Sequence, residues 1–295
     1  MEKNTLVQNM ENLYGENGKE WLSKLLTIFD ALKKHWKLSS LTPVDNLTFN
    51  YVAKALLPSK QAVVLKIGYD KKAIADEMRA LCHFEGASSI KLIDYNEENN
   101  ALLLQQAIPG ITLKSLYPAQ IDFVMDRYIE TMQGLHSKNT LPKHSAIHIS
   151  DWLKALDGAS PNKLPATLLS RAIELRNSLL KTSSTQLFLH GDLHLNNILK
   201  NNGQWLAIDP KGIIGDQEFE IAAFDFIHPT ELNHKKHLNP LFNSRIENIA
   251  RKSKLNSQRI KDWVFVRLLL SATWSIEDNC DPSWALELAK AMIIK

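Results

Sequence analysis

The stretch His190-Gly-Asp-Leu-His-Leu-Asn-Asn197, followed by Ile208-Asp-Pro210, gives the strongest indication of the fold of this chain. Asp192 and Asn197 lie five positions apart in a polar segment flanked by apolar, strand-like sequence. Asp209 follows twelve positions after Asn197, at the end of another apolar run. Carboxylate and amide oxygens placed at the ends of short strands can bind a hard metal ion. A carboxylate can also accept a proton.

This spacing fits phosphoryl transfer, which needs oxygen ligands for Mg²⁺ and a carboxylate that orients the acceptor hydroxyl. The protein-kinase pattern H-R-D-x-x-x-x-N followed by D-F-G meets both needs. Here Gly191 stands in place of the arginine and Asp209-Pro-Lys211 in place of D-F-G, while the distance from Asp192 to Asn197 is kept. The stretch therefore predicts the catalytic centre of a phosphotransferase, with Asp192, Asn197 and Asp209 as its candidate residues.

Two other interpretations of the same stretch remain open from the residues alone. The aspartate and asparagine could simply cap loops. Alternatively, His190, Asp192 and His194 alternate along the chain, so that in an extended segment they would share one side and could bind the metal of a hydrolase. No further cluster of His and Asp residues in the sequence clearly completes such a site.

Lys66 and Glu77 form a second constellation. Lys66 ends the apolar run Ala62–Leu65, and Glu77 lies in the helical sequence that follows. In kinases a strand lysine binds the α- and β-phosphates and is held by a helix glutamate. An edge-strand lysine that extends into solvent is the alternative. The order of Lys66, Glu77 and the downstream stretch favours phosphate binding.

The nucleotide pocket is expected to include two more segments. The apolar strand that runs into Pro109-Gly110 is suited to contact a base through its backbone, near Gln106 to Ile108. A loop near Thr48 is expected to cover the phosphates with backbone amides and a hydroxyl, although no G-x-G-x-x-G sequence is present there.

The pattern along the chain predicts an α+β, bilobal architecture. Apolar residues at helical spacing predict a leading helix over about 19–37. Strands are expected at 47–53, 61–67, 89–95 and 101–108, with a helix at about 70–85. Beyond a hinge at Pro109-Gly110 the sequence is mostly helical, except between 187 and 215. There, short strand-like pieces at 187–189, 198–199 and 205–208 alternate with polar loops. We therefore expect an N-terminal nucleotide-binding lobe (1–108), a C-terminal catalytic and acceptor-binding lobe (109–295) and a ligand cleft between them.

The bulk composition excludes several classes of protein. Apolar residues make up 44% and charged residues 23% of the 295-residue chain, as in ordinary globular proteins. The net charge of +3 is too small to indicate nucleic acid or an anionic membrane as a partner. The two cysteines, Cys82 and Cys280, do not form a disulfide framework, and no apolar stretch is long enough for a signal or a membrane span. We expect a cytoplasmic protein, either a monomer or a weak dimer.

At these residues the sequence resembles the aminoglycoside/hydroxyurea antibiotic resistance kinases of the streptomycin 6-phosphotransferase type, within the aminoglycoside phosphotransferase superfamily. The resemblance covers roughly 20–290. It is carried by Val63-Val-Leu-Lys66, Glu77-Met-Arg-Ala-Leu81, His190-Gly-Asp-Leu-His194, Ala207-Ile-Asp-Pro-Lys-Gly212 and Trp274-Ser-Ile-Glu-Asp278.

The resemblance implies a protein-kinase-like fold and transfer of the ATP γ-phosphate to a hydroxyl of a small molecule, with Mg²⁺ as the metal. Asp192 would then be the catalytic carboxylate, and Asn197 and Asp209 would hold Mg²⁺. His190 would shape the catalytic loop rather than react. Glu220 stands where the family usually has aspartate, and would support the same loop. Gln105-Gln106 stands where a Glu-Arg pair is more familiar in the family.

The acceptor is the least determined part of the prediction. A cationic aminoglycoside needs carboxylates around its site, and Trp152 and Trp274 could offer it stacking faces. The candidate carboxylates are Asp151, Asp157, Glu277 and Asp278. Each could equally be a solvated acid or a core tryptophan. Sugars and amino alcohols remain open as acceptors. A degenerate kinase that only binds nucleotide is disfavoured because Lys66, Asp192, Asn197 and Asp209 are all present.

Overall fold

The computed structural model describes residues 5–45, 47–138, 140–142, 146–159, 163–183, 185–232 and 235–293. The chain divides into two compact units, Met1–Gly110 and Ile111–Lys295. The division falls two residues after the boundary expected from the sequence.

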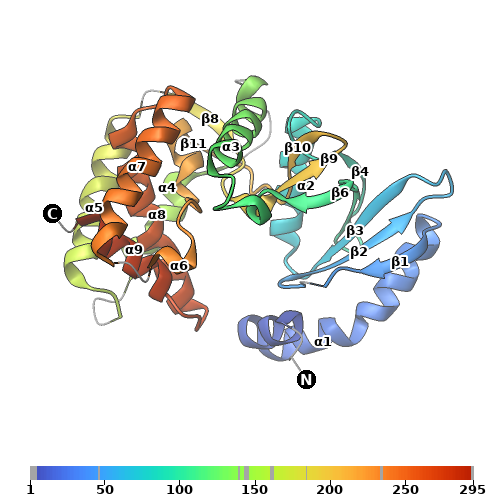
Figure 1. Ribbon diagram of the computed structural model, residues 1–295. Coiled ribbons are helices and arrows are strands. Elements are labelled where there is room, and N and C mark those ends of the chain that lie inside the picture. Colours follow the sequence, from blue (N-terminus) through green and yellow to red (C-terminus); the bar gives the residue numbers. More distant parts are fainter. Residues whose placement is uncertain are drawn as a thin grey trace. The chain divides into compact units, whose positions relative to one another are not determined.

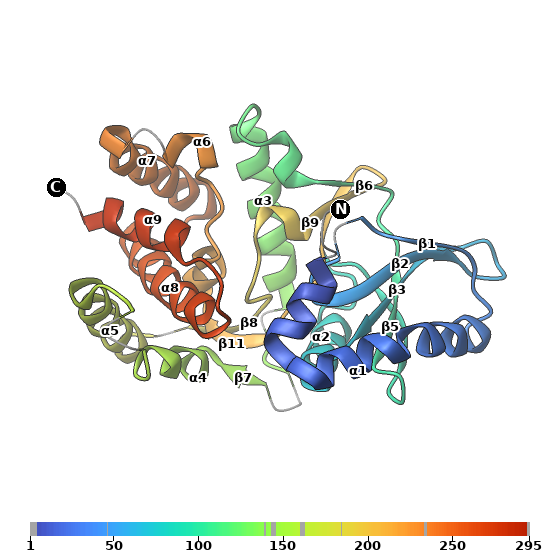
Figure 2. The same cartoon turned by 90° about the horizontal axis from the view of Figure 1, so that it is seen from below.

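The first unit is built on a five-stranded antiparallel sheet in the order β1-β2-β3-β5-β4 (Figures 1 and 2). Its strands are β1 (Ser39–Pro43), β2 (Asn50–Leu56), β3 (Ala62–Gly68), β4 (Leu92–Asn96) and β5 (Ala101–Gln105), and its helices are α1 (Thr5–His35) and α2 (Lys71–Phe84). Helix α1 packs its apolar side, with Trp21, Leu25 and Phe29, against a core that includes Val63 and Leu65 of β3.

Local sequence explains where α2 begins. Asp70 caps the helix, because its side chain accepts hydrogen bonds from the Lys72 and Ala73 backbone N–H groups at 2.8 and 3.0 Å. The cap follows directly on β3, so strand and helix are joined by a tight connection. As a result, Lys66 on the strand and Glu77 on the helix lie close together.

The second unit is mostly helical (Figure 1). Its α-helices are α3 (Ile121–Leu135), α4 (Ile149–Leu153), α5 (Ala166–Lys181), α6 (Pro229–Leu232), α7 (Lys235–Ser253), α8 (Ser257–Glu277) and α9 (Ser283–Ile293), and its 3₁₀ helices are η1 (Leu113–Leu116), η2 (His136–Lys138), η3 (Lys154–Leu156), η4 (Leu195–Asn197) and η5 (Gln217–Ala222). Helix α8 is its central element and packs against α5, α7, α9 and η5.

Two small sheets accompany these helices. One has the order β10-β9-β6, and the other has the order β7-β11-β8. The strands are β6 (Pro109–Thr112), at which the division between the units falls, β7 (Ile147–His148), β8 (Gln186–Leu189), β9 (Ile198–Asn201), β10 (Gln204–Ala207) and β11 (Ile213–Asp216). Strand β11 pairs antiparallel with β8 and parallel with β7.

Several boundaries differ from the expectation. The leading helix begins at Thr5 rather than at 19, and it bends at Gly15, whose φ of 54° is left-handed. The strand expected over 101–108 ends at Gln105, and Pro109-Gly110, where a hinge is expected, begins β6. Strands β1 and β11 were not expected, because Ser39–Pro43 and Ile213–Asp216 are too short and too mixed to show a two-residue period.

None of the helices that the structure describes combines the length and apolar character needed to cross a membrane.

Candidate active site

The stretch His190–Asn197 connects β8 to β9 in the second unit, and the β9–β10 hairpin brings the end of this stretch beside Ile208. Ala207 pairs with Ile198, and the Ile208 N–H donates a 2.9 Å hydrogen bond to the Asn197 carbonyl. Asp209 is the next residue after this last bond of the hairpin. Asn197 and Asp209 are twelve positions apart in the sequence. The hairpin makes them neighbours at its open end.

The side chain of Asn197 is oriented by the backbone of Asp192. Its Nδ2 donates a 3.0 Å hydrogen bond to the Asp192 carbonyl, and the residue is only 8% exposed. This bond directs the amide nitrogen inward, so that Oδ1 is the atom of this side chain that could bind a metal ion. Asp209 is half-buried and has a left-handed φ of 59°, a conformation that aspartate tolerates better than most residues.

Glu220 on η5 holds the start of the catalytic loop by its backbone. Its two carboxylate oxygens accept hydrogen bonds from the N–H groups of His190 and Gly191, both at 2.8 Å. Nε2 of His136 lies 3.0 Å from Oε2 of the same carboxylate. Burial acts to raise the pKa of Glu220, but His136, His190 and the Gly191 N–H outweigh it and lower the pKa. The buried carboxylate is thus an ionised clamp on the loop.

The backbone conformation and the space around position 191 both require glycine there. Its φ is 82°, and a Cβ atom there would lie 2.9 Å from Cγ1 of Ile213 on β11. A side chain is therefore excluded both by conformation and by space. This explains why the arginine of the protein-kinase pattern is missing at this position.

His190 is fully buried and both of its ring nitrogens are engaged. Nε2 lies 2.7 Å from the Ile208 carbonyl, and Nδ1 accepts a 3.2 Å hydrogen bond from the Asp192 N–H. This assigns a neutral ring with the proton on Nε2, and burial lowers the pKa of the imidazole. His190 therefore joins the loop to the end of the β9–β10 hairpin.

The hydrolase interpretation is wrong. The buried His190 has no nitrogen left for a metal ion, so His190, Asp192 and His194 do not form a ligand set. In the part of the chain that the structure describes, no three His, Cys, Asp or Glu side chains converge on a possible metal position.

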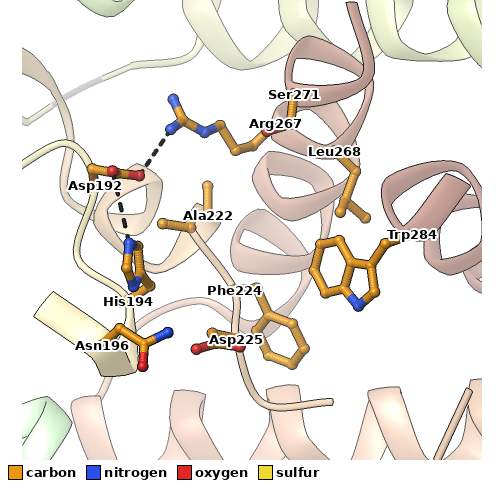
Figure 3. Close-up of a pocket in the computed structure, with 11 residues that line it drawn as sticks. Asp192, His194, Asn196, Ala222, Phe224, Asp225, Arg267, Leu268, Ser271 and Trp284 are labelled. Carbon is orange, nitrogen blue, oxygen red and sulfur yellow. Dashed lines mark hydrogen bonds and ion pairs between the residues drawn. The ribbon is translucent and has the colours of Figure 1, made fainter. Parts of the chain in front are cut away.

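Asp192 has one carboxylate oxygen bound to a cation. Nη2 of Arg267, on α8, donates to Oδ1 at 3.2 Å, while Nε2 of His194 lies 3.9 Å from Oδ2 (Figure 3). Burial acts to raise the pKa of the Asp192 carboxyl, but Arg267, then His194 and Lys211, more than offset it and lower the pKa. Asp192 is thus held as a carboxylate.

A cavity of about 340 Å³ opens beside this carboxylate (Figure 3). All of its lining comes from the second unit and combines polar and apolar groups, namely Asp192, His194, Asn196, Ala222, Ala223, Phe224, Asp225, Arg267, Leu268, Ser271 and Trp284. The indole of Trp284, on α9, is 37% exposed. A small molecule in this cavity could present a hydroxyl to Asp192.

The cavity is not lined by the residues expected to bind the acceptor. Asp151 caps α4 and pairs with Lys154, while Glu277 and Asp278 are exposed at the end of α8. Trp274 packs against Trp152 and Arg267. These residues lie outside this cavity because they were selected by their place on helices, whereas the lining of the cavity is set by which helix faces converge.

Sequence reasoning missed Asp225, Arg267 and Trp284. For Arg267 a signal was present, because it is the single charge in the apolar run Val264–Trp274 of a helix. A helix that is apolar on every side is buried, and a charge within it needs a partner. Asp225 and Trp284 carried no comparable signal.

In the first unit, Lys66 and Glu77 form a buried ion pair. Nζ of Lys66 lies 2.6 Å from Oε2 of Glu77, and the two residues are 4% and 6% exposed. A lysine buried in this way is held in one position by its carboxylate partner. The pairing has the geometry that the sequence led us to expect.

The other expected nucleotide contacts also lie in the first unit. Thr48 is exposed in the loop between β1 and β2, and its carbonyl accepts a 3.1 Å hydrogen bond from Asn9. Gln106 and Ile108 follow β5. The Gln106 N–H donates a long, 3.5 Å hydrogen bond to the Ala62 carbonyl.

Replacing Glu220 with glutamine is expected to lower the free energy of unfolding at pH 7 by about 1.5–3 kcal/mol, because two loop N–H groups lose a charged acceptor. A carboxylate with a lowered folded-state pKa stabilises the protein above its unfolded pKa, about 4.3 for glutamate, and this contribution is lost as the pH falls through the folded value. The wild type should therefore lose stability below about pH 4.3 more steeply than the variant. Urea unfolding between pH 3 and 7 measures both effects.

The exposed Glu247, replaced in the same way, is the matched control and should change neither quantity. Identical acid dependence in the wild type and the Glu220→Gln variant would contradict the assignment of an ionised clamp.

Comparison with known proteins gives the family. Residues 35–279 match the family described as aminoglycoside/hydroxyurea antibiotic resistance kinase. The chain belongs to this family. Within it, the chain is 23% identical to streptomycin 6-kinase of Streptomyces glaucescens, over 97% of this chain and 95% of that protein. It is also 23% identical to hydroxyurea phosphotransferase of Kitasatospora aureofaciens, over 93% and 80%.

The fold of this resistance-kinase family member is protein-kinase-like, with an antiparallel sheet in the first unit and helices in the second. A solved structure of the aminoglycoside phosphotransferase APH(4)-Ia, in ternary complex with ADP and hygromycin B, superimposes with a TM-score of 0.66 at 14% identity. The match covers 89% of this chain and 96% of that one. Membership of the resistance-kinase family confirms the resemblance seen in the sequence.

Proposed function

We propose that this protein transfers the γ-phosphate of ATP to a hydroxyl group of a small molecule, namely an aminoglycoside of the streptomycin type. The observation that carries the proposal is the position of Asp192. Its carboxylate lines a cavity, while its own backbone carbonyl orients Asn197, the neighbour of Asp209 across the hairpin. One loop thus presents a base to an acceptor and hard oxygen ligands to a metal ion.

Asn197 and Asp209 suit Mg²⁺ in particular. This ion binds through one or two protein carboxylate or carbonyl oxygens and completes its shell with phosphate and water oxygens. The amide oxygen of Asn197, just before β9, and the carboxylate of Asp209, just after β10, are such a pair. When bound, Mg²⁺ neutralises charge on the phosphates during transfer.

Asp192 acts on the acceptor in this proposal. The acceptor oxygen forms a bond to the γ-phosphorus while the bond from that phosphorus to the β–γ bridging oxygen breaks, and ADP leaves. The hydroxyl proton passes to the Asp192 carboxylate. A carboxylate with a lowered pKa is a weak base, so its main contribution is to orient the hydroxyl, which suits a transition state with little bond formation to the nucleophile.

Lys66 is assigned to the α- and β-phosphates of the same nucleotide, with Glu77 as its support. Thr48, Gln106 and Ile108 are assigned to the phosphate-covering loop and to the base. Glu220 and His190 support the loop and do not contact substrate.

The acceptor class rests on the relatives, among which streptomycin 6-kinase matches along nearly the whole chain. One observation favours a second candidate, a less cationic acceptor such as a sugar or an amino alcohol. Both carboxylates of the cavity already have a cation, since Asp192 pairs with Arg267 and Asp225 pairs with Lys114. A polycationic acceptor would have to compete for these carboxylates.

An ADP-release assay over a panel of acceptors tests the proposal. Streptomycin should stimulate ADP formation, chelation with EDTA should abolish it, and added Mg²⁺ should restore it. Mass spectrometry of the product should show the added phosphate. Stimulation only by a sugar or an amino alcohol would select the second candidate, and no stimulation by any member of the panel would contradict both.

A further inference from the structure

Arg267 has an unusual environment for a charged side chain. Its guanidinium carbon lies 5.1 Å from the ring centre of Trp152, 5.0 Å from that of Trp274 and 5.9 Å from that of Phe219. We call these three rings the aromatic cage. They come from α4, α8 and η5, so three separate elements of the second unit converge on one cation.

The cage holds the guanidinium in a defined position. The two indoles contact one another edge to face, with centroids 5.5 Å apart and planes at 80°. A planar guanidinium over aromatic faces gains cation–π attraction without losing its charge. The remaining freedom of the side chain is small, because Arg267 is only 8% exposed.

Packing alone does not account for this residue. Nη1 of Arg267 is buried and has no hydrogen-bond partner among the residues that the structure describes. A buried donor without a partner is unfavourable, and an apolar side chain of similar length would fill the same space without that cost. The polar contact that remains is the bond from Nη2 to Asp192 at 3.2 Å.

We propose that Arg267 is a positioning residue, which the aromatic cage fixes so that it holds Oδ1 of Asp192 and directs Oδ2 toward the acceptor hydroxyl. The two oxygens of the carboxylate then have separate roles. Oδ1 stays bound to the guanidinium, and Oδ2, on the side of His194, takes the hydroxyl proton (Figure 3). This inference rests on the proposed function and adds the choice of the reacting oxygen.

The proposal also gives Trp152 and Trp274 a role other than substrate stacking. Neither is among the residues that line the cavity, and both rings contact the guanidinium. They act on the reaction through Arg267. Trp284, by contrast, lines the cavity with an exposed indole and is the ring expected to contact the acceptor.

The first test replaces Arg267 with methionine, which keeps the length and removes the charge. We expect kcat to fall about 10–100-fold, while KM for ATP stays within about twofold, because the oxygen that receives the proton is no longer oriented. Arg267→Lys should retain an intermediate kcat. In Arg267→Ala, added guanidinium ion at millimolar concentration should restore part of the lost kcat.

Arg251, exposed on α7, is the matched control, and Arg251→Met should leave kcat unchanged. Thermal unfolding of each variant separates loss of folding from loss of orientation. A folded Arg267→Met variant with wild-type kcat would overturn the inference. A wild type that is inactive with every acceptor would instead overturn the proposed function.

The second test is a double-mutant cycle between Arg267→Met and Trp274→Leu. If Trp274 acts through the guanidinium, the single Trp274→Leu variant should lower kcat, and the double variant should be no slower than Arg267→Met alone. Trp284→Leu should instead raise KM for the acceptor. Two results together would overturn the role of the cage: losses in kcat that are additive, and a raised acceptor KM for Trp274→Leu in both backgrounds. They would mean that Trp274 stacks against the acceptor itself.

Discussion

Asp192→Asn is expected to reduce kcat by about 10²–10⁴-fold, because it removes the carboxylate that orients the acceptor hydroxyl and takes its proton. Asparagine keeps the shape of the side chain but cannot accept the hydroxyl proton. ATP affinity should change by no more than about twofold, because Asp192 acts on the acceptor and not on the nucleotide. Single-turnover kinetics and nucleotide titration by calorimetry measure the two quantities separately.

Asp30, exposed on α1, is a matched control, and its replacement by asparagine should leave both quantities unchanged. The prediction depends on Asp192 being the residue that faces the cavity beside Arg267. Turnover by Asp192→Asn at the wild-type rate would remove the basis of the proposed function.

Lys66→Met is expected to have the second largest effect, and to affect both activity and stability. Loss of one charged hydrogen bond to phosphate corresponds to about 1.5–3 kcal/mol, or roughly 10–100-fold in kcat/KM for ATP. The remaining Glu77 would be a buried charge without its lysine, which lowers the free energy of unfolding by about 3–5 kcal/mol. Steady-state kinetics and urea unfolding measure these changes.

The double variant Lys66→Met/Glu77→Leu distinguishes the two effects. It removes both charges, so that its stability should return close to that of the wild type while its kcat/KM for ATP stays low. Lys54, an exposed lysine on β2, gives the matched single variant Lys54→Met, which should alter neither property. Recovery of activity along with stability would mean that Lys66 is structural and does not bind phosphate.

The sequence by itself determined which of the candidate site residues lie close to one another. Asp192, Asn197 and Asp209 are joined by one loop and one hairpin, and Lys66 and Glu77 by one strand and the helix after it. Contacts of this kind depend on short-range periodicity and on caps such as Asp70, which local sequence encodes. The same is true of most helices, whose apolar faces recur at a regular spacing.

Tertiary structure decided the surroundings of Asp192. Arg267 reaches it from 75 residues away in the sequence, and Glu220 reaches His190 from 30 away. The cavity likewise combines Asp225, Trp284 and the catalytic loop. Which faces of distant helices converge depends on how the whole core packs, and no local pattern encodes that packing. The residue types therefore indicated phosphoryl transfer, whereas only the packed second unit placed a caged arginine on one oxygen of Asp192.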